Sequence, residues 1–290
     1  MKRVLIPICI AVAGGVASMI YAETDPAVIA HVGAEPSTTY FRALSQQWIG
    51  DWQQYGQTFT GQQAVLFSRI FLLVLVLTPT IFLLHYIVVG AKKFNHDGPQ
   101  VPFFSLFTRL NHWLAAIGFT LLVGTGIMVI FGKIYGGGQI GLWARNIHLL
   151  SAMVFTFAAV CMFFIWVRDM LPMPHDFLWM LIMGGYLSKK KKPVPAGKFN
   201  AGQKMWFWLA TLGGMVMAYS GYMLWLFQAN VDQLRLMAMI HNFLGAALVA
   251  FFITHMYMSL FAIKGSLTSM ITGYKPREEV EILHSRYTIS

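Results

Sequence analysis

The stretch "HNFLGAALVAFFITHMYM" (residues 241–258) is apolar and long enough to cross a membrane as a helix, yet it carries two histidines, His241 and His255. An α-helix turns about 100° and rises about 1.5 Å per residue, so this interval ends about 40° short of four full turns and about 21 Å further along. The two imidazoles are therefore predicted to share one helix face at opposite depths. Ionisable groups inside a membrane are costly, and where they occur they usually mark a functional position.

Composition places the chain in a membrane. Of its 290 residues, 57% are hydrophobic and only 11% are charged, against about 25% charged residues in soluble domains. A helix needs about 20 apolar residues to cross the hydrocarbon core, and none of the candidate windows alternates like a barrel strand. The sequence therefore predicts an all-α integral membrane protein built as a transmembrane helix bundle. The predicted helices span residues 70–89, 113–131, 147–167, 205–227 and 239–263.

The chain divides into five predicted parts. Residues 1–22 have the layout of a secretory signal, with two basic residues before a short apolar run and small residues after it. A sixth membrane helix is the alternative for this part. Residues 23–69 are expected to form an exported, periplasmic extension with an amphipathic helix over 40–55. An extra first transmembrane helix over 70–90, a four-helix core over 105–265 and a C-terminal tail over 266–290 follow.

Basic residues predict the orientation of the helices. Lys and Arg are retained in short loops on the cytoplasmic side, and an exported N-terminal segment makes the distribution consistent, with fourteen basic residues inside and five outside. The N-terminal segment is thus predicted outside and the C-terminus in the cytoplasm. This topology and contact with anionic membrane lipid explain the net charge of +10, which makes no case for binding nucleic acid.

The remaining histidines fall into two groups. Those in predicted loops or in the tail are interpreted as solvated residues: His31, His96, His175 and His284. In contrast, His148 begins the third predicted helix at the outside, at the depth of His241. His112 begins the second helix at the inside, at the depth of His255. The topology therefore predicts two pairs of imidazoles at matched depths.

Two histidines separated by the width of a flat macrocycle are what six-coordinate haem iron needs. The two pairs predict two stacked b-type haems, the outer one held by His148 and His241 and the inner one by His112 and His255. Neither cysteine lies in a CxxCH attachment motif, so the haems would be bound non-covalently. Hydrogen bonds between helices, a proton relay and another kind of metal site are the alternatives.

Other groups near the predicted haems have more than one interpretation. His85, in the cytoplasmic half of the first predicted helix, is an alternative to His112 as the partner of His255. Met256 and Met258 flank His255 and are interpreted as packing residues.

Arg109 and Arg145 each stand three residues before a predicted ligand. At that spacing each is a candidate partner for haem propionates, through charge-assisted hydrogen bonds near a membrane surface. Anchoring at the membrane interface is the alternative.

The segment "GKFNAGQKMWFW" (residues 197–208) lies just inside the membrane before the fourth predicted helix, close in depth to His255. Asn200, the backbone of Gly202 and Gln203 offer neutral hydrogen-bonding groups beside aromatic side chains. That combination suits a quinone, whose ring is apolar and whose two carbonyls need donors. A simple helix cap at "NAG" is the alternative.

These segments resemble a known family, the cytochrome b (gamma) subunits of membrane-bound respiratory formate dehydrogenases. The resemblance covers roughly residues 107–274 and rests on "FTRLNHW", "IHLLSAM", "GKFNAGQKMWFW" and "HNFLGAALVAFFITHMYMSLFAIKGSLTSMITG". It implies a dihaem four-helix domain in a bacterial inner membrane. The positions it implies are His112, His148, His241 and His255 for the haem ligands, and Asn200, Gly202, Gln203 and His255 for the quinone site.

The resemblance also implies a redox loop. A molybdenum- or tungsten-containing catalytic (alpha) subunit oxidises formate outside the membrane, an iron-sulfur (beta) subunit passes electrons to the outer haem, and menaquinone or ubiquinone is reduced near the inner one. The chain itself shows no formate-oxidising site. Rival interpretations are the haem-b anchor of a nickel-iron hydrogenase or of another periplasmic oxidoreductase, and a haem-free transporter.

Overall fold

The computed structural model describes Gly50, residues 55–226 and residues 230–289. The predicted signal over 1–22 lies outside the described residues. So does nearly all of the predicted exported segment up to residue 54, including most of the amphipathic helix expected over 40–55.

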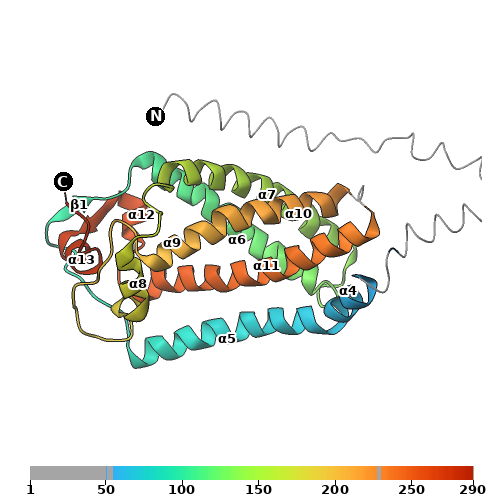
Figure 1. Ribbon diagram of the computed structural model, residues 1–290, viewed down its shortest axis with the longest axis horizontal. Coiled ribbons are helices and arrows are strands. Elements are labelled where there is room, and N and C mark those ends of the chain that lie inside the picture. The colour runs from blue at the N-terminus through green and yellow to red at the C-terminus, as the bar shows by residue number, and fades with distance from the viewer. Residues whose placement is uncertain (1–49, 51–54, 227–229, 290) are drawn as a thin grey trace, which may run out of the picture. The chain divides into compact units, whose positions relative to one another are not determined.

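Among the described residues, five helices are long and apolar enough to cross a membrane (Figure 1). The first three are α5 (Phe67–Val88), α6 (Leu106–Ile130) and α7 (Gly138–Trp166). The fourth joins α9 (Ala201–Trp208), η5 (Leu209–Gly213) and α10 (Gly214–Leu226), and the fifth joins α11 (Val231–Tyr257) and η6 (Met258–Ala262). The predicted all-α integral membrane fold is confirmed.

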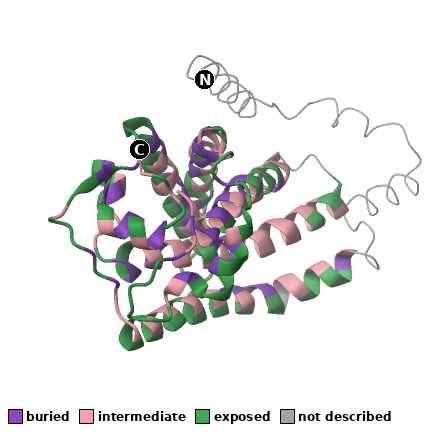
Figure 2. Cartoon of the chain, turned by 60° about the vertical axis from the view of Figure 1, so that its left-hand side comes forward, coloured by how far each residue is buried: buried purple, intermediate pink, exposed green. Residues whose placement is uncertain are grey.

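Long apolar surfaces on these helices face outward. Only 6% of the most apolar window of α5 is buried within the protein, and Figure 2 shows exposed and half-buried residues along the long helices. A water-soluble protein does not carry apolar surface of this extent, so the exposed faces fit contact with lipid. The exposed apolar residues of α5 include Leu72, Leu73, Val76, Leu77, Ile81, Leu84 and Ile87.

The helices begin earlier than hydropathy predicts. Helix α6 starts at Leu106, where Ser105 caps it by accepting a hydrogen bond from the backbone N–H of Thr108 at 3.2 Å. A helix does not need apolar residues to form, so polar residues that precede an apolar run can belong to the same helix. The N-cap residue marks where that helix begins. His112, His148 and His241 consequently lie inside their helices, whereas the sequence placed two of them at helix starts.

The described residues form two compact units. One comprises residues up to 70 and residues 215–245, with α4 (Gln57–Gly61), η3 (Gln62–Leu66), α10 and the first part of α11. In this unit the rings of Phe67 and Phe243 meet edge to face with their centroids 6.1 Å apart. The helical turns before residue 67 were not predicted, because residues 57–63 are too polar for a hydropathy window to include them.

The other unit comprises residues 71–214 and 246–290. In it α6 and α7 pack along one another (Figure 1). A Cβ atom on Gly118 would stand 3.2 Å from the backbone nitrogen of Phe155, so glycine lets the two backbones approach closely. The side chain of Asn111 adds a hydrogen bond from Nδ2 to the carbonyl of Ala158 at 3.0 Å.

The C-terminal tail of this unit is folded. It contains α12 (Thr268–Thr272), β2 (Tyr274–Pro276) and α13 (Arg277–Leu283), and β2 pairs antiparallel with β1 (Gln100–Pro102). The prolines of "KKKKPVPAGK" (residues 189–198) predict a solvated loop without a helix on the inside. The loop over 188–199 contains no helix, but Val194 and Ala196 are buried against the tail. The backbone N–H of Val194 donates to Ile282 at 2.7 Å. The prediction of a solvated loop is therefore wrong for these two residues.

His284 was predicted to be solvated, and this prediction is wrong. The residue is only 2% exposed, and its Nδ1 lies 2.9 Å from the carbonyl oxygen of Gly197. Burial, followed by the nearby charge of Lys275, lowers the pKa of His284 to about 3. Lys275 in turn forms a buried ion pair with Glu279, with Nζ and Oε1 2.5 Å apart. The tail is thus held by buried polar contacts, of which the one between His284 and Gly197 joins residues far apart in the sequence.

Docking of the tail should depend on pH. Between the ordinary histidine pKa of 6.5 and the folded value of about 3, the unfolded tail binds a proton that the folded tail excludes. The contribution of His284 to the free energy of unfolding is therefore fully present above pH 6.5. Below pH 6.5 it falls by about 1.4 kcal/mol per pH unit. Limited proteolysis should cleave the tail faster at pH 5 than at pH 7.5, and His284→Gln should lose much of this dependence. Equal cleavage of the unaltered protein at both pH values would contradict the prediction.

Candidate functional site

The structure brings together the two histidines predicted for the inner pair. His112 on α6 and His255 on α11 have ring centroids 6.2 Å apart and ring planes inclined by 55°. Trp206 on α9 stacks on His255, with the centroids 5.6 Å apart and the planes within 20°. The Nδ1 atom of His112 is buried and makes no hydrogen bond with any described residue. The two imidazoles thus lie close together, with the indole ring of Trp206 stacked on one of them.

The end of α6 that carries His112 is fixed by neighbouring backbone. Trp113 donates from Nε1 to the carbonyl of Met270 at 3.1 Å, and Arg109 donates from Nη1 to the carbonyl of Ile271. The Nε atom of Arg109 is buried and has no hydrogen-bond partner among the described residues. Arg145, the other candidate for haem propionates, is exposed near the start of α7.

The histidines predicted for the outer pair each contact a hydroxyl group. His148 on α7 has Nδ1 2.9 Å from Oγ1 of Thr125 on α6. His241 on α11 has Nδ1 3.0 Å from Oγ of Ser220 on α10. The two histidines fall in different units of the structure, so their pairing stays a prediction. Neither hydroxyl group was predicted from the sequence.

His85, the alternative partner of His255, has both of its ring nitrogens engaged in this arrangement. Nδ1 lies 2.5 Å from the hydroxyl of Tyr257, and Nε2 lies 2.9 Å from the carbonyl oxygen of Tyr186. These contacts tie α5 to α11 and to the loop after α8 (Pro174–Leu181) and η4 (Met183–Gly185).

The segment predicted to bind quinone forms a helix cap at the start of α9. Asn200 Oδ1 accepts from the backbone N–H of Gln203, and Gln203 Oε1 accepts from the backbone N–H of Asn200, both at 2.9 Å. Gly202 is needed for packing, since a Cβ atom there would stand 3.0 Å from Cη2 of Trp179. The alternative interpretation as a cap is therefore correct, and it uses only the amide oxygens, since Nδ2 of Asn200 and Nε2 of Gln203 donate no hydrogen bond to a described residue.

The residue that follows the cap, Lys204, forms a buried ion pair. Lys204 donates from Nζ to Oδ2 of Asp176 at 2.7 Å and to the carbonyl of Leu171 at 3.0 Å. His175, predicted to be solvated, has its Nε2 atom buried 3.9 Å from Oδ1 of Asp176. The prediction for His175 is therefore wrong, because α8 folds against α9.

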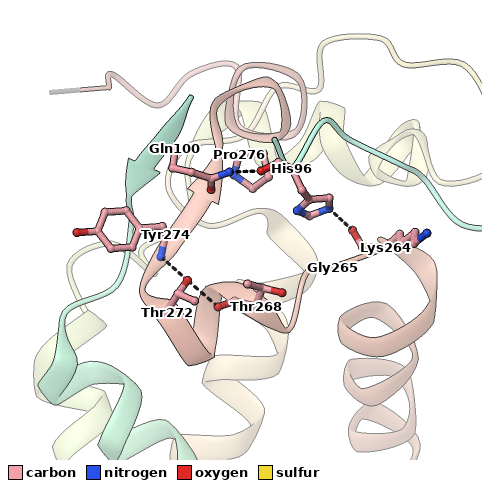
Figure 3. A pocket seen from close by; sticks show the side chains of 8 residues that line it. All are labelled: His96, Gln100, Lys264, Gly265, Thr268, Thr272, Tyr274 and Pro276. Carbon is pink, nitrogen blue, oxygen red and sulfur yellow. Dashed lines mark hydrogen bonds between the residues drawn. The ribbon is translucent and has the colours of Figure 1, made fainter. Parts of the chain in front are cut away.

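A shallow hollow lies elsewhere on the same unit, at the end predicted to face the cytoplasm (Figure 3). His96 borders it, with Nε2 2.8 Å from the carbonyl oxygen of Lys264. The lining residues are His96, Gln100, Lys264, Gly265, Thr268, Thr272, Tyr274 and Pro276. Because none of them is a predicted site residue, the hollow is not part of the candidate site.

Comparison with known proteins identifies the family. A family model described as prokaryotic cytochrome b561 matches residues 104–273, which carry all four predicted ligands. The chain belongs to the prokaryotic cytochrome b561 family. Membership implies haem b, and a pair of histidines suits that cofactor, since the porphyrin supplies the other four nitrogen ligands. No group of three or more His, Cys, Asp or Glu side chains is placed to hold a metal ion within the described part of this cytochrome.

Relatives of this cytochrome b561 protein include cytochrome subunits of formate dehydrogenases. The cytochrome b556(Fdn) subunit of the nitrate-inducible formate dehydrogenase of Escherichia coli K12 is 30% identical over 192 residues, covering 62% of this chain and 86% of that subunit. The cytochrome b556(fdo) subunit of the same organism is 26% identical over 189 residues, 62% and 87% of the two chains. The Haemophilus influenzae cytochrome b556 subunit is 27% identical over 177 residues, 57% and 73%. The resemblance to formate dehydrogenase cytochrome b subunits is confirmed.

Replacing His85 should separate its structural role from haem binding. We expect His85→Leu to retain the full haem content of the cytochrome, because both ring nitrogens already have partners. The variant should lose stability by about 1–3 kcal/mol, since it leaves buried hydrogen-bonding groups unsatisfied. Pyridine extraction measures the haem content, and thermal unfolding in detergent measures the stability. Loss of one haem with unchanged stability would instead make His85 a ligand.

Proposed function

We propose that this chain is the membrane-anchoring, dihaem cytochrome b subunit of a formate dehydrogenase complex, and that it delivers electrons to a quinone near the cytoplasmic face. The observation that carries the proposal is the separation of His112 and His255. Two metal–nitrogen bonds of roughly 2 Å, plus the distance from each nitrogen to its ring centre, would set the ring centres of two histidines that bind one iron about 6 Å apart. Their centroids are 6.2 Å apart, so the residues present fit an iron between them.

The outer haem is assigned to His148 and His241. Each imidazole is held at Nδ1 by a hydroxyl from a neighbouring helix, which is how metal-ligating histidines are commonly oriented. Nε2 is then the nitrogen assigned to iron. Bound haem supplies reversible one-electron transfer between ferric and ferrous iron.

The arginines have separate proposed roles at the two levels. Arg109, whose buried Nε has no hydrogen-bond partner among the described residues, is assigned to a propionate of the inner haem. Arg145, exposed three residues before His148, is assigned to a propionate of the outer haem. Charge-assisted hydrogen bonds of this kind are stronger than neutral ones.

The quinone site is proposed at Asn200, Gly202, Gln203 and His255. Trp206, on the same helix as the cap, stacks on His255, so α9 carries the cap at its start and contacts the inner ligand one turn later. The amide N–H groups of Asn200 and Gln203 are donors suited to the quinone carbonyls. Menaquinone and ubiquinone offer the same carbonyl chemistry.

The partners and the membrane orientation complete the proposal. The relatives are named as cytochrome subunits of formate dehydrogenases, so we assign an iron-sulfur (beta) subunit and a molybdenum- or tungsten-containing (alpha) subunit as partners. The bias of basic residues supports a bacterial inner-membrane location, with the N-terminal segment periplasmic and the C-terminus cytoplasmic. The formate-oxidising step belongs to the partner.

Single substitutions should remove the two haems separately. His148→Ala should lose the outer haem and retain the inner one, whereas His255→Ala should lose the inner haem and also slow quinone reduction. Pyridine extraction gives the haem count, and the rate of cytochrome oxidation by a quinone analogue gives the second result. Two haems per chain in either variant would refute the assigned ligands.

The electron donor distinguishes this proposal from a hydrogenase anchor. On addition of formate, the purified complex should show the absorption bands of reduced haem. Addition of hydrogen should leave the spectrum unchanged. Reduction by hydrogen alone would assign the chain to a nickel-iron hydrogenase. Purified protein without any cytochrome absorption would instead favour a haem-free transporter.

A further inference from the structure

Each of the two histidines assigned to the outer haem has a hydroxyl group at Nδ1, and no such contact is found for the inner pair among the described residues. Thr125 lies at Nδ1 of His148, and Ser220 lies at Nδ1 of His241, at 2.9 and 3.0 Å. The first contact joins α6 and α7, and the second joins α10 and α11. The same arrangement thus occurs twice, in different units and between different helices.

The direction of these hydrogen bonds can be derived from the hydroxyl groups. Thr125 has one hydroxyl hydrogen and donates it to the carbonyl of Leu121 at 2.6 Å. Ser220 likewise donates to the carbonyl of Val216 at 2.8 Å. With its hydrogen used, each hydroxyl oxygen accepts from the imidazole. A neutral imidazole that donates from Nδ1 has its lone pair on Nε2.

A glycine follows each hydroxyl residue and lets the ring lie against the helix backbone. A Cβ atom on Gly126 would stand 3.5 Å from Cε1 of His148, and one on Gly221 would stand 3.2 Å from Cε1 of His241. The sequences Thr-Gly and Ser-Gly therefore each provide a hydroxyl acceptor for the imidazole N–H and a glycine without a side chain beside the ring. A side chain in place of Gly221 would crowd the His241 ring at 3.2 Å, whereas the 3.5 Å distance at Gly126 is an ordinary van der Waals contact.

The inner pair is built differently. Nδ1 of His112 is buried and has no hydrogen-bond partner in the described part of the chain, and His255 is placed by stacking on Trp206. A hydroxyl acceptor at Nδ1 therefore distinguishes the histidines of the proposed outer haem from those of the proposed inner haem.

We propose that Thr125 and Ser220 are positioning residues of the outer haem, which fix the Nε2-ligating form of His148 and His241 and lower the reduction potential of that haem. The inference rests on the proposed ligand assignment. An Nδ1–H that donates a hydrogen bond makes the opposite nitrogen a stronger electron donor, and this stabilises oxidised iron. A lower potential at the outer level favours electron flow from outside to inside.

Two substitutions test this proposal in the complete complex. Thr125→Val keeps the shape of the side chain and removes the acceptor, and Ser220→Ala removes the other one. Anaerobic redox titration should show that each variant raises the potential of the same single haem, the one that His148→Ala removes. Haem affinity at that site should fall by about 10- to 100-fold. Electron paramagnetic resonance of the oxidised protein should show a changed signal for that haem and an unchanged signal for the other.

Two further variants separate positioning from folding. Thr125→Ser retains the hydroxyl and should restore the potential of the unaltered protein. Thr120→Val is a matched control on α6, because Thr120 makes the same kind of bond to its own helix, to Ala116 at 2.7 Å, and contacts no predicted ligand. It should behave like the unaltered protein.

Several outcomes would overturn the inference. These are unchanged potentials and signals in both Thr125→Val and Ser220→Ala, a shift in the haem that His255→Ala removes, or loss of haem that Thr125→Ser does not restore. The proposed function fails in a different way. If His148→Ala and His241→Ala each keep two haems, the ligand assignment is wrong, whatever the hydroxyl variants do.

Discussion

An imidazole inside an apolar membrane helix needs partners for its ring nitrogens, and this requirement explains how the described helices contact one another. His85 shows the complete case, with Tyr257 at one nitrogen and the carbonyl of Tyr186 at the other. His148 and His241 each use a hydroxyl at Nδ1. His112 has a buried Nδ1 without a hydrogen bond to a described residue and faces His255 at 6.2 Å. An unsatisfied polar group in this setting costs about 1–3 kcal/mol, and the close approach of the two rings is the observation that supports the proposed inner haem.

The same requirement attaches the first transmembrane helix, which lies outside residues 104–273 that match the cytochrome b561 model. Besides His85, the segment after α5 carries Lys92, which is buried and donates from Nζ to the carbonyls of Ser188 and Lys190 at 2.9 and 3.1 Å. Burial lowers the pKa of Lys92, so these carbonyl contacts offset part of the cost of its charge. Polar contacts, in addition to hydrophobic packing, therefore fix this added helix to the cytochrome domain.

Much of the fold is predictable from hydropathy, because five apolar runs of membrane length have few alternative structures. The helix ends are less predictable, since the caps that set them, such as Ser105, involve residues outside the apolar windows. The folded tail, the partial burial of His175 and the burial of His284 depend on how separate segments pack, and local patterns carry no signal for that packing. At the candidate site, the spacing of the histidines was informative, but their hydroxyl partners were missed. The signal available was a Ser or Thr directly before a glycine in a helix facing each histidine.

The start of α9 shows why a structural and a functional interpretation of the same residues need not compete. An amide side chain has one oxygen acceptor and two N–H donors. In the reciprocal cap, Asn200 and Gln203 use their oxygens to accept from backbone N–H groups, and this fixes both side chains in one orientation. The donors are then held in place at no further conformational cost, and a quinone carbonyl needs donors. Trp179, packed over Gly202, and Trp206, stacked on His255, hold the helix that carries them. A cap that only terminated the helix would work equally well with Ser or Asp at position 200, whereas a cap that also presents N–H donors requires an amide.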